Sequence, residues 1–456
     1  IVQAIKKACG KDFPVSLRYS VLSKTKGFRQ GALPGEDYIE AGRDMAESER
    51  AAKYLQDAGY DCLNCDNGTY DAWYWAHPPV YMPENCNLAD VEHIKKFVDI
   101  PVICAGRLDP RTAAESIAAG RLDGAGFARS FLADQPWIVK LKEGREADIR
   151  PCILCHNGCF NMCHYKGVPN DQDLSDSLHL ARCAVNAETM QWNKHYIRKT
   201  ASPKTVHIIG GGIGGMESAR VLKLRGHHPI IHEKSGELGG AFIAAGAESY
   251  KGKLRDLLAW YRRQMAELEI EVHLNDEVKD VSAFKGCPVI VATGATPRIL
   301  RRVSGYEKMI EACEYLLGAP TGETVAVIGG GLTGSEIAYE LALQGKKPVI
   351  VEMKDDLVSQ KGVCLANSSY LREWFDLHKV PVYLQTALKE VRDGSILCTD
   401  KDGKELEIPC DSVISCAGYI PAPLPEAGKA RLVGDCRSVG NLRTVVWDAY
   451  EAAMKI

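Results

Sequence analysis

The sequence predicts an α/β chain built from three consecutive blocks. In residues 1–150, short apolar runs alternate with helical patterns, as they do in a parallel β/α architecture. Residues 151–200 form a cysteine-rich connector with few periodic elements. Residues 201–456 contain two glycine-rich strand–turn–helix units, and each stands at the front of its own β/α pattern. Together these observations predict an incomplete β/α domain, a connector and two nucleotide-binding folds.

The bulk composition is that of an ordinary globular protein. Hydrophobic residues make up 46% and charged residues 25% of the 456-residue chain, and the formal net charge is −3. This charge gives no reason to expect nucleic acid or a membrane as partner, and no apolar run reaches the ~18 residues of a membrane span. The default location is the cytoplasm, where the 17 cysteines would be thiols or metal ligands. A homo-oligomer is compatible with the sequence.

Four strands are expected in the first block, at residues 15–18, 62–65, 102–105 and 124–127. Helical patterns at 38–56 and 110–119 lie between them. Four such βα units correspond to the C-terminal half of an eight-stranded (β/α)8 TIM barrel. Half a barrel would leave its edges and core uncovered, and the chain opens at Ile1 inside a helical pattern. We therefore expect further barrel residues upstream of this sequence.

The first glycine-rich motif follows the apolar strand 206–209. It has the spacing GxGxxG, with Gly210, Gly212 and Gly215, and it leads into a helix. Such glycines allow a tight turn and a close approach of the backbone to a pyrophosphate, and the helix N-terminus offers N–H groups to the anion. A second strand ends at Glu233, 23 positions after the first glycine (233 − 210). Its carboxylate is suited to accept hydrogen bonds from ribose hydroxyls.

The second glycine-rich motif repeats this pattern. Gly329, Gly331 and Gly334 follow another apolar strand, and Glu352 again comes 23 positions after the first glycine (352 − 329). For a single motif, a glycine turn without a ligand is a serious alternative. Two copies with strand, helix and acid in the same places argue against it.

The pair of motifs resembles the two-dinucleotide flavoproteins related to the disulfide reductases. Further matching positions are Gly240 of ELGG, Thr293 and Gly294 of ATG, and Gly434 and Asp435 of VGD. The resemblance implies FAD in the first site, with the VGD motif near the flavin and its ribityl chain, and NAD(P)H in the second. Glu352 favours NADH because its charge would repel a 2′-phosphate, although Lys354 lies nearby. Residues 201–456 lack a redox-active CxxC, so electron relay is expected there rather than disulfide reduction.

The connector contains a run of closely spaced cysteines. Cys152, Cys155 and Cys159 follow the spacing CxxCxxxC, and Cys163 and Cys183 come after them. Thiolates this close can hold one face of a metal cluster, and all-thiolate ligation suits zinc or iron–sulfur. Structural zinc, which usually shows two separated CxxC pairs, and thiols without metal are the alternatives. Between two flavin-type sites we expect a [4Fe–4S] cluster, with Cys183 as fourth ligand and Cys163 as its rival.

The three blocks in this order resemble the 2-enoate reductases and 2,4-dienoyl-CoA reductases, which are Old Yellow Enzyme-like barrels fused to an FAD/NAD(P)H module. YWAHPP at 74–79 and CAVN at 183–186 resemble the clostridial 2-enoate reductases most. In that family the fourth cysteine usually lies about a dozen residues after the third, whereas Cys183 lies 24 after Cys159 (183 − 159), which implies an insertion. The expected parts are an FMN domain at 1–150, a cluster-binding connector at 151–200, an FAD domain at 201–320 and 401–456, and an NAD(H) domain at 321–400.

The resemblance implies FMN at the carboxyl ends of the barrel strands. It assigns Arg18 to the N1/O2 edge of the flavin, where a cation stabilises the anionic reduced form; a surface salt bridge is the alternative. Gly106 with Arg107, and Gly126 with Arg129, follow the last two strands. Barrels commonly bind phosphate there, so these residues are expected to hold the FMN phosphate. Glycines needed only for the turns are the alternative.

The resemblance predicts an NADH:flavin oxidoreductase. Electrons would pass from NADH to FAD, singly through the cluster to FMN, and then to a 2-enoate or similar α,β-unsaturated carbonyl. The aromatic stretch 68–81 is expected to line the substrate site, with His77 first and Tyr74 second as residues that polarise the substrate; ordinary packing is the alternative. The same architecture could serve 3-oxo-Δ4 steroids, bile acids or 2,4-dienoyl-CoA. A non-catalytic electron-transfer subunit is the alternative of another class.

Overall fold

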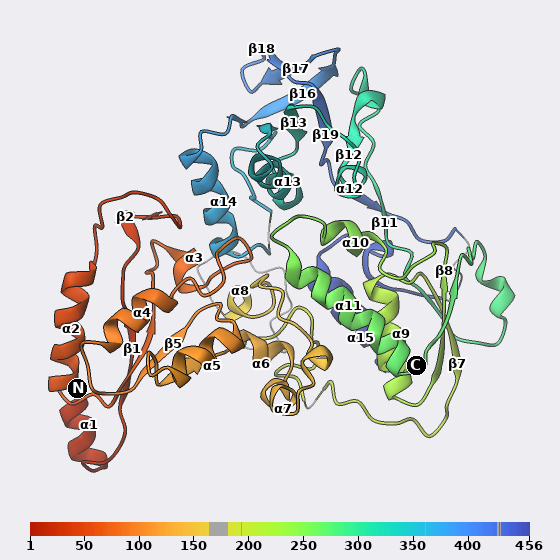
Figure 1. Cartoon of the computed structure of the whole chain (residues 1–456). Helices are drawn as coiled ribbons and strands as arrows, with labels where there is room; N and C mark the ends of the chain where they lie inside the picture. Colours follow the sequence, from red (N-terminus) through yellow and green to blue (C-terminus); the bar gives the residue numbers. More distant parts are fainter. Residues whose placement is uncertain (164–180, 193, 361, 426–427, 429) are drawn as a thin grey trace. The chain divides into compact units, whose positions relative to one another are not determined.

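The computed structural model describes residues 1–163, 181–192, 194–360, 362–425, 428 and 430–456 (Figure 1). It divides into two compact units. The first comprises Ile1–Ala128 together with Leu365–His378, and the second comprises Arg129–Cys364 together with Lys379–Ile456. Among the described helices, none combines the length and the apolar character that crossing a bilayer requires.

The first unit is built on a four-stranded parallel sheet in the order β1–β4–β5–β6. Its strands are β1 (Ser16–Ser20), β4 (Cys62–Asp66), β5 (Val102–Ala105) and β6 (Gly124–Gly126). All four expected strands are therefore confirmed. Leu63, Val102 and Cys104 are buried in the core of this unit. Because the strands are parallel, their carboxyl ends, where the expected FMN residues lie, share one edge of the sheet.

The helices and the hairpin of the first unit are α1 (Val2–Cys9), α2 (Met45–Asp57), α3 (Trp73–Ala76), α4 (Leu88–Lys95), α5 (Pro110–Ala118), α14 (Leu365–Leu377), β2 (Thr25–Gly27) and β3 (Gln30–Gly31). Helix α5 agrees with the prediction. The helix expected from residue 38 is wrong in its start, because α2 begins only at Met45. Asp44, whose backbone is extended, caps it by accepting a hydrogen bond from the backbone N–H of Glu47 at 2.8 Å.

Helix α14 joins the first unit from far along the chain. It lies in the sequence expected to form the NAD(H) domain, but its contacts place it with residues 1–128. Tyr370 of α14 stacks on Tyr81 with ring centroids 5.3 Å apart and meets Tyr74 edge-on at 5.5 Å. Glu373 accepts a hydrogen bond from the Tyr74 hydroxyl at 2.7 Å. The aromatic stretch 68–81 thus packs against this helix.

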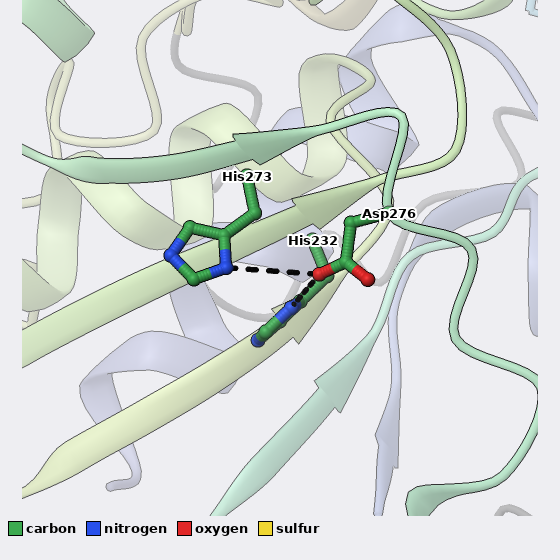
Figure 2. A group of neighbouring side chains, drawn as sticks. All are labelled: His232, His273 and Asp276. Atoms are coloured by element: carbon green, nitrogen blue, oxygen red, sulfur yellow. Dashed lines mark hydrogen bonds and ion pairs between the residues drawn. The ribbon is translucent and has the colours of Figure 1, made fainter.

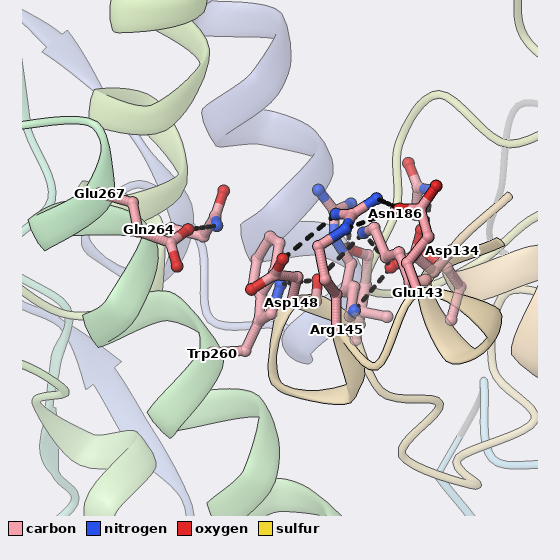
Figure 3. A network of polar contacts seen from close by, with 12 residues as sticks. Asp134, Glu143, Arg145, Asp148, Asn186, Trp260, Gln264 and Glu267 are labelled. Carbon is pink, nitrogen blue, oxygen red and sulfur yellow. Dashed lines mark hydrogen bonds and ion pairs between the residues drawn. The ribbon is translucent and has the colours of Figure 1, made fainter. Parts of the chain in front are cut away.

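The second unit opens with α6 (Arg129–Ala133), α7 (Trp137–Lys142) and the 3-10 turn η1 (Glu146–Asp148), and the connector follows with α8 (Phe160–Cys163). The turn η1 contacts α11 (Gly252–Glu267), as Figure 3 shows. The Trp260 indole N–H donates to the Asp148 carbonyl at 3.0 Å. The Asn186 side-chain amide donates to the Ala133 carbonyl at 3.0 Å, which links the connector to the end of α6.

The first nucleotide-binding fold has a parallel sheet in the order β21–β10–β7–β8–β9. Its elements are β7 (Thr205–Ile209), α9 (Ile213–Leu224), β8 (His228–Glu233), α10 (Ala241–Ala245), α11, β9 (Glu271–Leu274), η3 (Val281–Phe284), β10 (Val289–Val291), β21 (Arg431–Leu432), η5 (Gly434–Cys436) and α15 (Leu442–Met454). Helices α9, α11 and α15 pack together beside this sheet (Figure 1). Since β21 pairs with β10, the fold combines two separate segments of the chain.

The second nucleotide-binding fold is inserted between those segments. Its sheet has the order β12–β19–β13–β14–β15. The elements are η4 (Tyr306–Lys308), β12 (Ile310–Glu311), α12 (Ala312–Leu316), β13 (Thr324–Ile328), α13 (Leu332–Leu343), β14 (Lys347–Val351), β15 (Val382–Tyr383), the antiparallel β16 (Thr386–Val391), β17 (Ser395–Asp400) and β18 (Glu405–Pro409), and β19 (Ser412–Ser415). Strands β11 (Ala295–Pro297) and β20 (Tyr419–Pro421) pair where the chain enters and leaves this fold. Since β19 pairs with β13, the sheet includes residues beyond 400.

Candidate functional site

The first glycine loop has the geometry that a pyrophosphate needs. Gly210 has φ of +108°, and a methyl group on Gly215 would lie 1.9 Å from the Gly210 carbonyl oxygen. Gly212 is the N-cap of α9 and gives the helix no side-chain cap. The space beside Gly212 is open, because a methyl group there would meet no atom closer than 3.9 Å. The N–H groups of the first helical turn are therefore suited to bind an anion.

Glu233 at the end of β8 faces this loop. Its carboxylate accepts hydrogen bonds from the backbone N–H of Gly211 at 2.6 Å and from the N–H and hydroxyl of Ser235 at 2.8 Å each. The side chain is buried, so these bonds fix its direction. A carboxylate has about four acceptor positions, and capacity for a ribose hydroxyl remains.

The ELGG and ATG motifs also border the first loop. The residue before Gly240 donates its backbone N–H to the Gly211 carbonyl at 2.9 Å, and Gly240 itself has φ of +55°. The Thr293 hydroxyl donates to a backbone carbonyl of the C-terminal segment at 2.7 Å, and Gly294 follows with φ of +73°. Both turns are thus held in place by hydrogen bonds to the backbone.

Gly434 and Asp435 form the short turn η5 at the edge of the same fold. The Gly434 N–H donates to the Asp448 carboxylate at 2.9 Å, and the Asp435 carboxylate accepts from the Gly440 N–H at 3.0 Å. Burial raises the pKa of Asp435 above its ordinary value. A backbone hydrogen bond therefore orients the Asp435 carboxylate of the VGD turn.

The second glycine loop reproduces the first. Gly329 has φ of +107°, and a methyl group on Gly334 would lie 1.8 Å from the Gly329 carbonyl oxygen. Gly331 is the N-cap of α13 and provides no side-chain cap. Both loops therefore need glycine at the same places, because the helix starts directly against the turn.

Glu352, directly after β14, faces the second glycine loop in the same way as Glu233 faces the first. It accepts hydrogen bonds from the backbone N–H of Gly330 at 2.5 Å and of Lys354 at 2.8 Å. Lys354 thus contributes its backbone to hold the carboxylate in place. The residues of both loops fit dinucleotides with ribose hydroxyls bound by a carboxylate.

A buried charge cluster joins the two nucleotide-binding folds, and the sequence did not predict it. Lys251 Nζ, at the start of α11, lies 2.7 Å from Glu336 Oε2 of α13 and 3.0 Å from Glu248 Oε2. All three side chains are buried, and burial raises the pKa of Glu248 to about 7. The available signal was Glu336 near the start of a mostly apolar helix, two positions after Gly334. Its partner is 85 residues away, so local pattern could not identify the pair.

The four predicted cysteine ligands meet in one cavity. Cys152, Cys155, Cys159 and Cys183 line the same small cavity. Gly158 brings the two cysteine segments together, because a methyl group there would lie 2.4 Å from the backbone nitrogen of residue 184. The side chain of the rival ligand, Cys163, is outside the described part of the chain.

Arg129 also lines this cavity. Its Nη1 lies 2.7 Å from Nε2 of His156, which belongs to the cysteine loop. Burial raises the pKa of Cys155 to about 11 and that of Cys159 to about 12, while the nearby Arg129 charge opposes both shifts. The sequence assigned Arg129 to a phosphate. No local signal indicated its contact with the cysteine loop.

Within the first unit, Arg18 is the middle residue of β1. Its guanidinium is paired with Asp66 and donates to Asn64 Oδ1 at 3.3 Å, both on the neighbouring strand β4. Burial raises the pKa of Asp66 to about 6 even though Arg18 opposes that shift. About half of the Arg18 side chain is exposed, so the cation is both fixed in direction and accessible.

Gly106, directly after β5, and Gly126, the last residue of β6, lie at the same sheet edge. Gly106 has φ of +110°, and a methyl group on it would lie 2.3 Å from the Asn87 amide nitrogen. Gly126 is paired with Ala105 across the two strands. The Arg107 guanidinium donates to the backbone carbonyls of residues 79 and 80 at 2.9 and 2.7 Å. Arg107 therefore holds the end of the aromatic stretch.

His77 and Tyr74, the two candidates for contacting the substrate, differ in how exposed they are. Tyr74 is 0% exposed and its hydroxyl is bound to Glu373. Burial, reinforced by the adjacent carboxylate, raises the pKa of Tyr74 well above its ordinary value. His77 caps the short helix α3, is partly exposed, and stacks on Trp73 with ring centroids 5.9 Å apart.

Comparison with protein families matches both halves of the chain. The family described as NADH:flavin oxidoreductase / NADH oxidase matches residues 1–148. The family described as pyridine nucleotide-disulphide oxidoreductase matches residues 204–435. These matches coincide with the β-sheet of the first unit and with the two glycine loops of the second.

Characterised relatives align along the whole chain. A cinnamate reductase from Clostridium sporogenes is 38% identical over 468 aligned residues, covering 100% of this chain and 68% of the relative. An NADH oxidase from Thermoanaerobacter brockii is 30% identical, with coverage of 100% and 68%. A solved complex of 2-naphthoyl-CoA reductase has the same fold, with a TM-score of 0.84, 24% identity, and coverage of 100% of this chain and 67% of that one. The chain is an oxidoreductase with flavin- and NAD-binding domains, and it belongs to the 2-enoate reductase-like family of NADH:flavin oxidoreductases.

Proposed function

We propose that this protein uses NADH to reduce the activated C=C bond of a 2-enoate or a similar α,β-unsaturated carbonyl compound. The similarity to a cinnamate reductase supports this class of substrate. The observation that carries the proposal is that one unit contains two dinucleotide loops and a cavity lined by four cysteines. That combination suits a protein that receives electrons from a nicotinamide and passes them on.

The spacing of the cysteines favours an iron–sulfur cluster over zinc. Zinc binds sulfur at about 2.3 Å, so four thiolates around one zinc ion lie about 3.8 Å apart. Among the described residues, one group of three His, Cys, Asp or Glu side chains brings its ligand atoms within 4.8 Å of one another. That group contains no cysteine. No three of the four sulfurs therefore all lie within 4.8 Å of one another, which suits a [4Fe–4S] cluster with a separate iron for each cysteine better than a single zinc ion.

When bound, FAD, the [4Fe–4S] cluster and FMN supply the route along which the electrons of NADH reach the substrate. Gly212, Glu233 and Asp435 would hold FAD, and Glu352 would hold the ribose of NADH. Gly106 and Gly126 would let the backbone approach the FMN phosphate. Arg18 would provide a fixed cation at the reduced flavin. His77, being more exposed than Tyr74, is our first candidate for orienting the substrate carboxylate or carbonyl.

Anaerobic titration of the intact protein tests this proposal. NADH should bleach the flavins and the cluster, and cinnamate should restore the colour with one product formed per NADH consumed. In Cys183→Ser, NADH should still bleach FAD, but the iron content and the reoxidation by cinnamate should fall together. Cys287→Ser, which changes a cysteine outside the cavity, should behave as the wild type.

Other outcomes of the same titration identify the alternatives. Reoxidation by a 3-oxo-Δ4 steroid, a bile acid or a 2,4-dienoyl-CoA, but not by cinnamate, would keep the electron route and change the substrate. Bleaching by NADH without recovery by any enoate, enone or enoyl-CoA would indicate a non-catalytic electron carrier. Zinc instead of iron after oxygen-free purification would refute the route itself.

A further inference from the structure

A second group of metal-type ligands lies on the sheet of the first nucleotide-binding fold, away from the cysteines. It consists of His232 on β8, His273 on β9 and Asp276 just after β9 (Figure 2). His232 and His273 are directly paired across the two parallel strands, so their side chains lie on the same face of the sheet. The Asp276 N–H donates to the Glu233 carbonyl at 2.9 Å, which brings its carboxylate to the same place.

The ligand atoms of these three side chains converge. His232 Nδ1 lies 2.6 Å and His273 Nδ1 lies 3.7 Å from the same oxygen, Oδ2 of Asp276. One ligand atom from each residue falls within 4.8 Å of the other two. His232 is buried, whereas the side chains of His273 and Asp276 are 46% and 41% exposed. The group therefore has a fixed inner end and an outer end that solvent can reach.

The far nitrogen of each histidine has its own partner. His273 Nε2 lies 2.7 Å from the Glu271 carboxylate, and His232 Nε2 lies 3.0 Å from His207 Nδ1. Metal-binding histidines usually donate the other ring N–H to a carboxylate or similar acceptor, which fixes the ring and its tautomer. Here both rings are held by Nε2, and both turn Nδ1 towards Asp276.

We propose that His232, His273 and Asp276 form a binding site for a zinc-type divalent cation. Imidazole and carboxylate are ligands for Zn²⁺, and three protein ligands leave a fourth position for water. With the ring protons on Nε2, donated to Glu271 and His207, both Nδ1 atoms carry the lone pairs that a metal requires. Zinc bonds of about 2.0–2.2 Å separate neighbouring ligand atoms by about 3.4 Å. The 3.7 Å between His273 Nδ1 and Asp276 Oδ2 is already close to this value. The 2.6 Å between His232 Nδ1 and the same oxygen would widen by a small side-chain rotation.

The position of the site suggests a structural role. His232 directly precedes Glu233 on β8, and consecutive strand residues point to opposite faces of a sheet. A cation bound there would link β8 to the turn after β9 on the face opposite the glycine loop. We therefore expect metal binding to stabilise this fold without taking part in electron transfer.

Zinc binding to the intact, anaerobically purified protein tests the proposal. After equilibrium dialysis against Zn²⁺, the wild type should hold about one more zinc per chain than His273→Ala or Asp276→Asn. His228→Ala is the matched control, because His228 is an exposed histidine at the other end of β8. Iron should be measured in the same samples, and equal iron in all of them would show that the extra zinc is not in the cysteine cavity.

A second measurement separates a metal site from a hydrogen-bonded cluster of histidines. Glu271→Gln keeps all three proposed ligands and changes only the partner of His273. It should weaken zinc binding roughly 10- to 100-fold. Zinc should also raise the melting temperature of the wild type and of His228→Ala, but not that of Asp276→Asn. Equal zinc content and equal zinc-induced shifts in all variants would refute the site and leave a hydrogen-bond network only.

Discussion

Glu233 and Glu352 make the same backbone contact in the two nucleotide-binding folds. Each carboxylate accepts a hydrogen bond from the second glycine of its loop, Gly211 or Gly330, 22 residues earlier in the chain. Each also accepts one from the backbone N–H two residues further on. The two acids therefore allow a comparison between two loops that share these backbone contacts.

We predict that Glu352→Ala raises the KM for NADH about 10-fold, which corresponds to roughly 1.4 kcal/mol, and narrows the preference for NADH over NADPH. The variant loses charge-assisted bonds to the ribose and the charge that repels a 2′-phosphate. Steady-state kinetics with both nucleotides check this. Glu233→Ala is the matched variant, and it should lower the FAD content instead. An unchanged KM for NADH in Glu352→Ala would contradict the assignment of Glu352 to NADH. A raised KM for NADH in flavin-replete Glu233→Ala would contradict it as well.

We predict that Gly158→Ala lowers the iron content and leaves FAD bound. Its new methyl group would lie 2.4 Å from the backbone of residue 184 and would separate Cys159 from Cys183. Iron and flavin analysis of the anaerobically purified protein measures the effect. Gly236→Ala is the control, because the nearest atom to a methyl group there is 3.6 Å away. Full iron occupancy in Gly158→Ala would count against the four-cysteine cavity as the cluster site.

We predict that Lys251→Met destabilises the second unit by about 3–5 kcal/mol, because it leaves the buried carboxylates of Glu248 and Glu336 without their cation. Chemical denaturation of the flavin-loaded protein gives the free energy of unfolding. Lys253→Met removes a neighbouring lysine whose ion pair is exposed. It should lower the free energy of unfolding by less than about 1 kcal/mol. Similar losses in both variants would mean that the buried cluster contributes no more than a surface pair.

We predict that Glu373→Gln reduces the pH dependence of stability. Burial raises the pKa of Glu373 to about 7 in the folded protein, above its ordinary value of 4.5. Between these values the folded state binds more protons than the unfolded state, so stability falls as the pH rises from about 4.5 to 7. Melting temperatures across this range should fall less steeply in Glu373→Gln than in the wild type. An identical slope would show that the carboxyl group is not protonated beside Tyr74.

Features with a local pattern were predicted from the sequence. The four strands of the first unit are short apolar runs, and the glycine loops are recognisable from residue type and spacing. The start of α2 was missed because residues 38–44 continue the helical pattern, whereas the cap at Asp44 decides where the helix begins. Tyr74–Glu373 and Lys251–Glu336 join residues 299 and 85 positions apart. Such contacts depend on the tertiary fold, which spacing alone does not encode.

The membership of α14 in the first unit has a consequence for dissecting the protein. The chain leaves the second unit before Leu365 and re-enters it after His378, so the two units are connected at three junctions rather than one. A fragment cut after Ala128 would lack α14 and would expose Tyr74 and Tyr81 to solvent. Separate expression of the two halves should therefore yield an aggregation-prone fragment. A minimal version of the first unit must include residues 365–378.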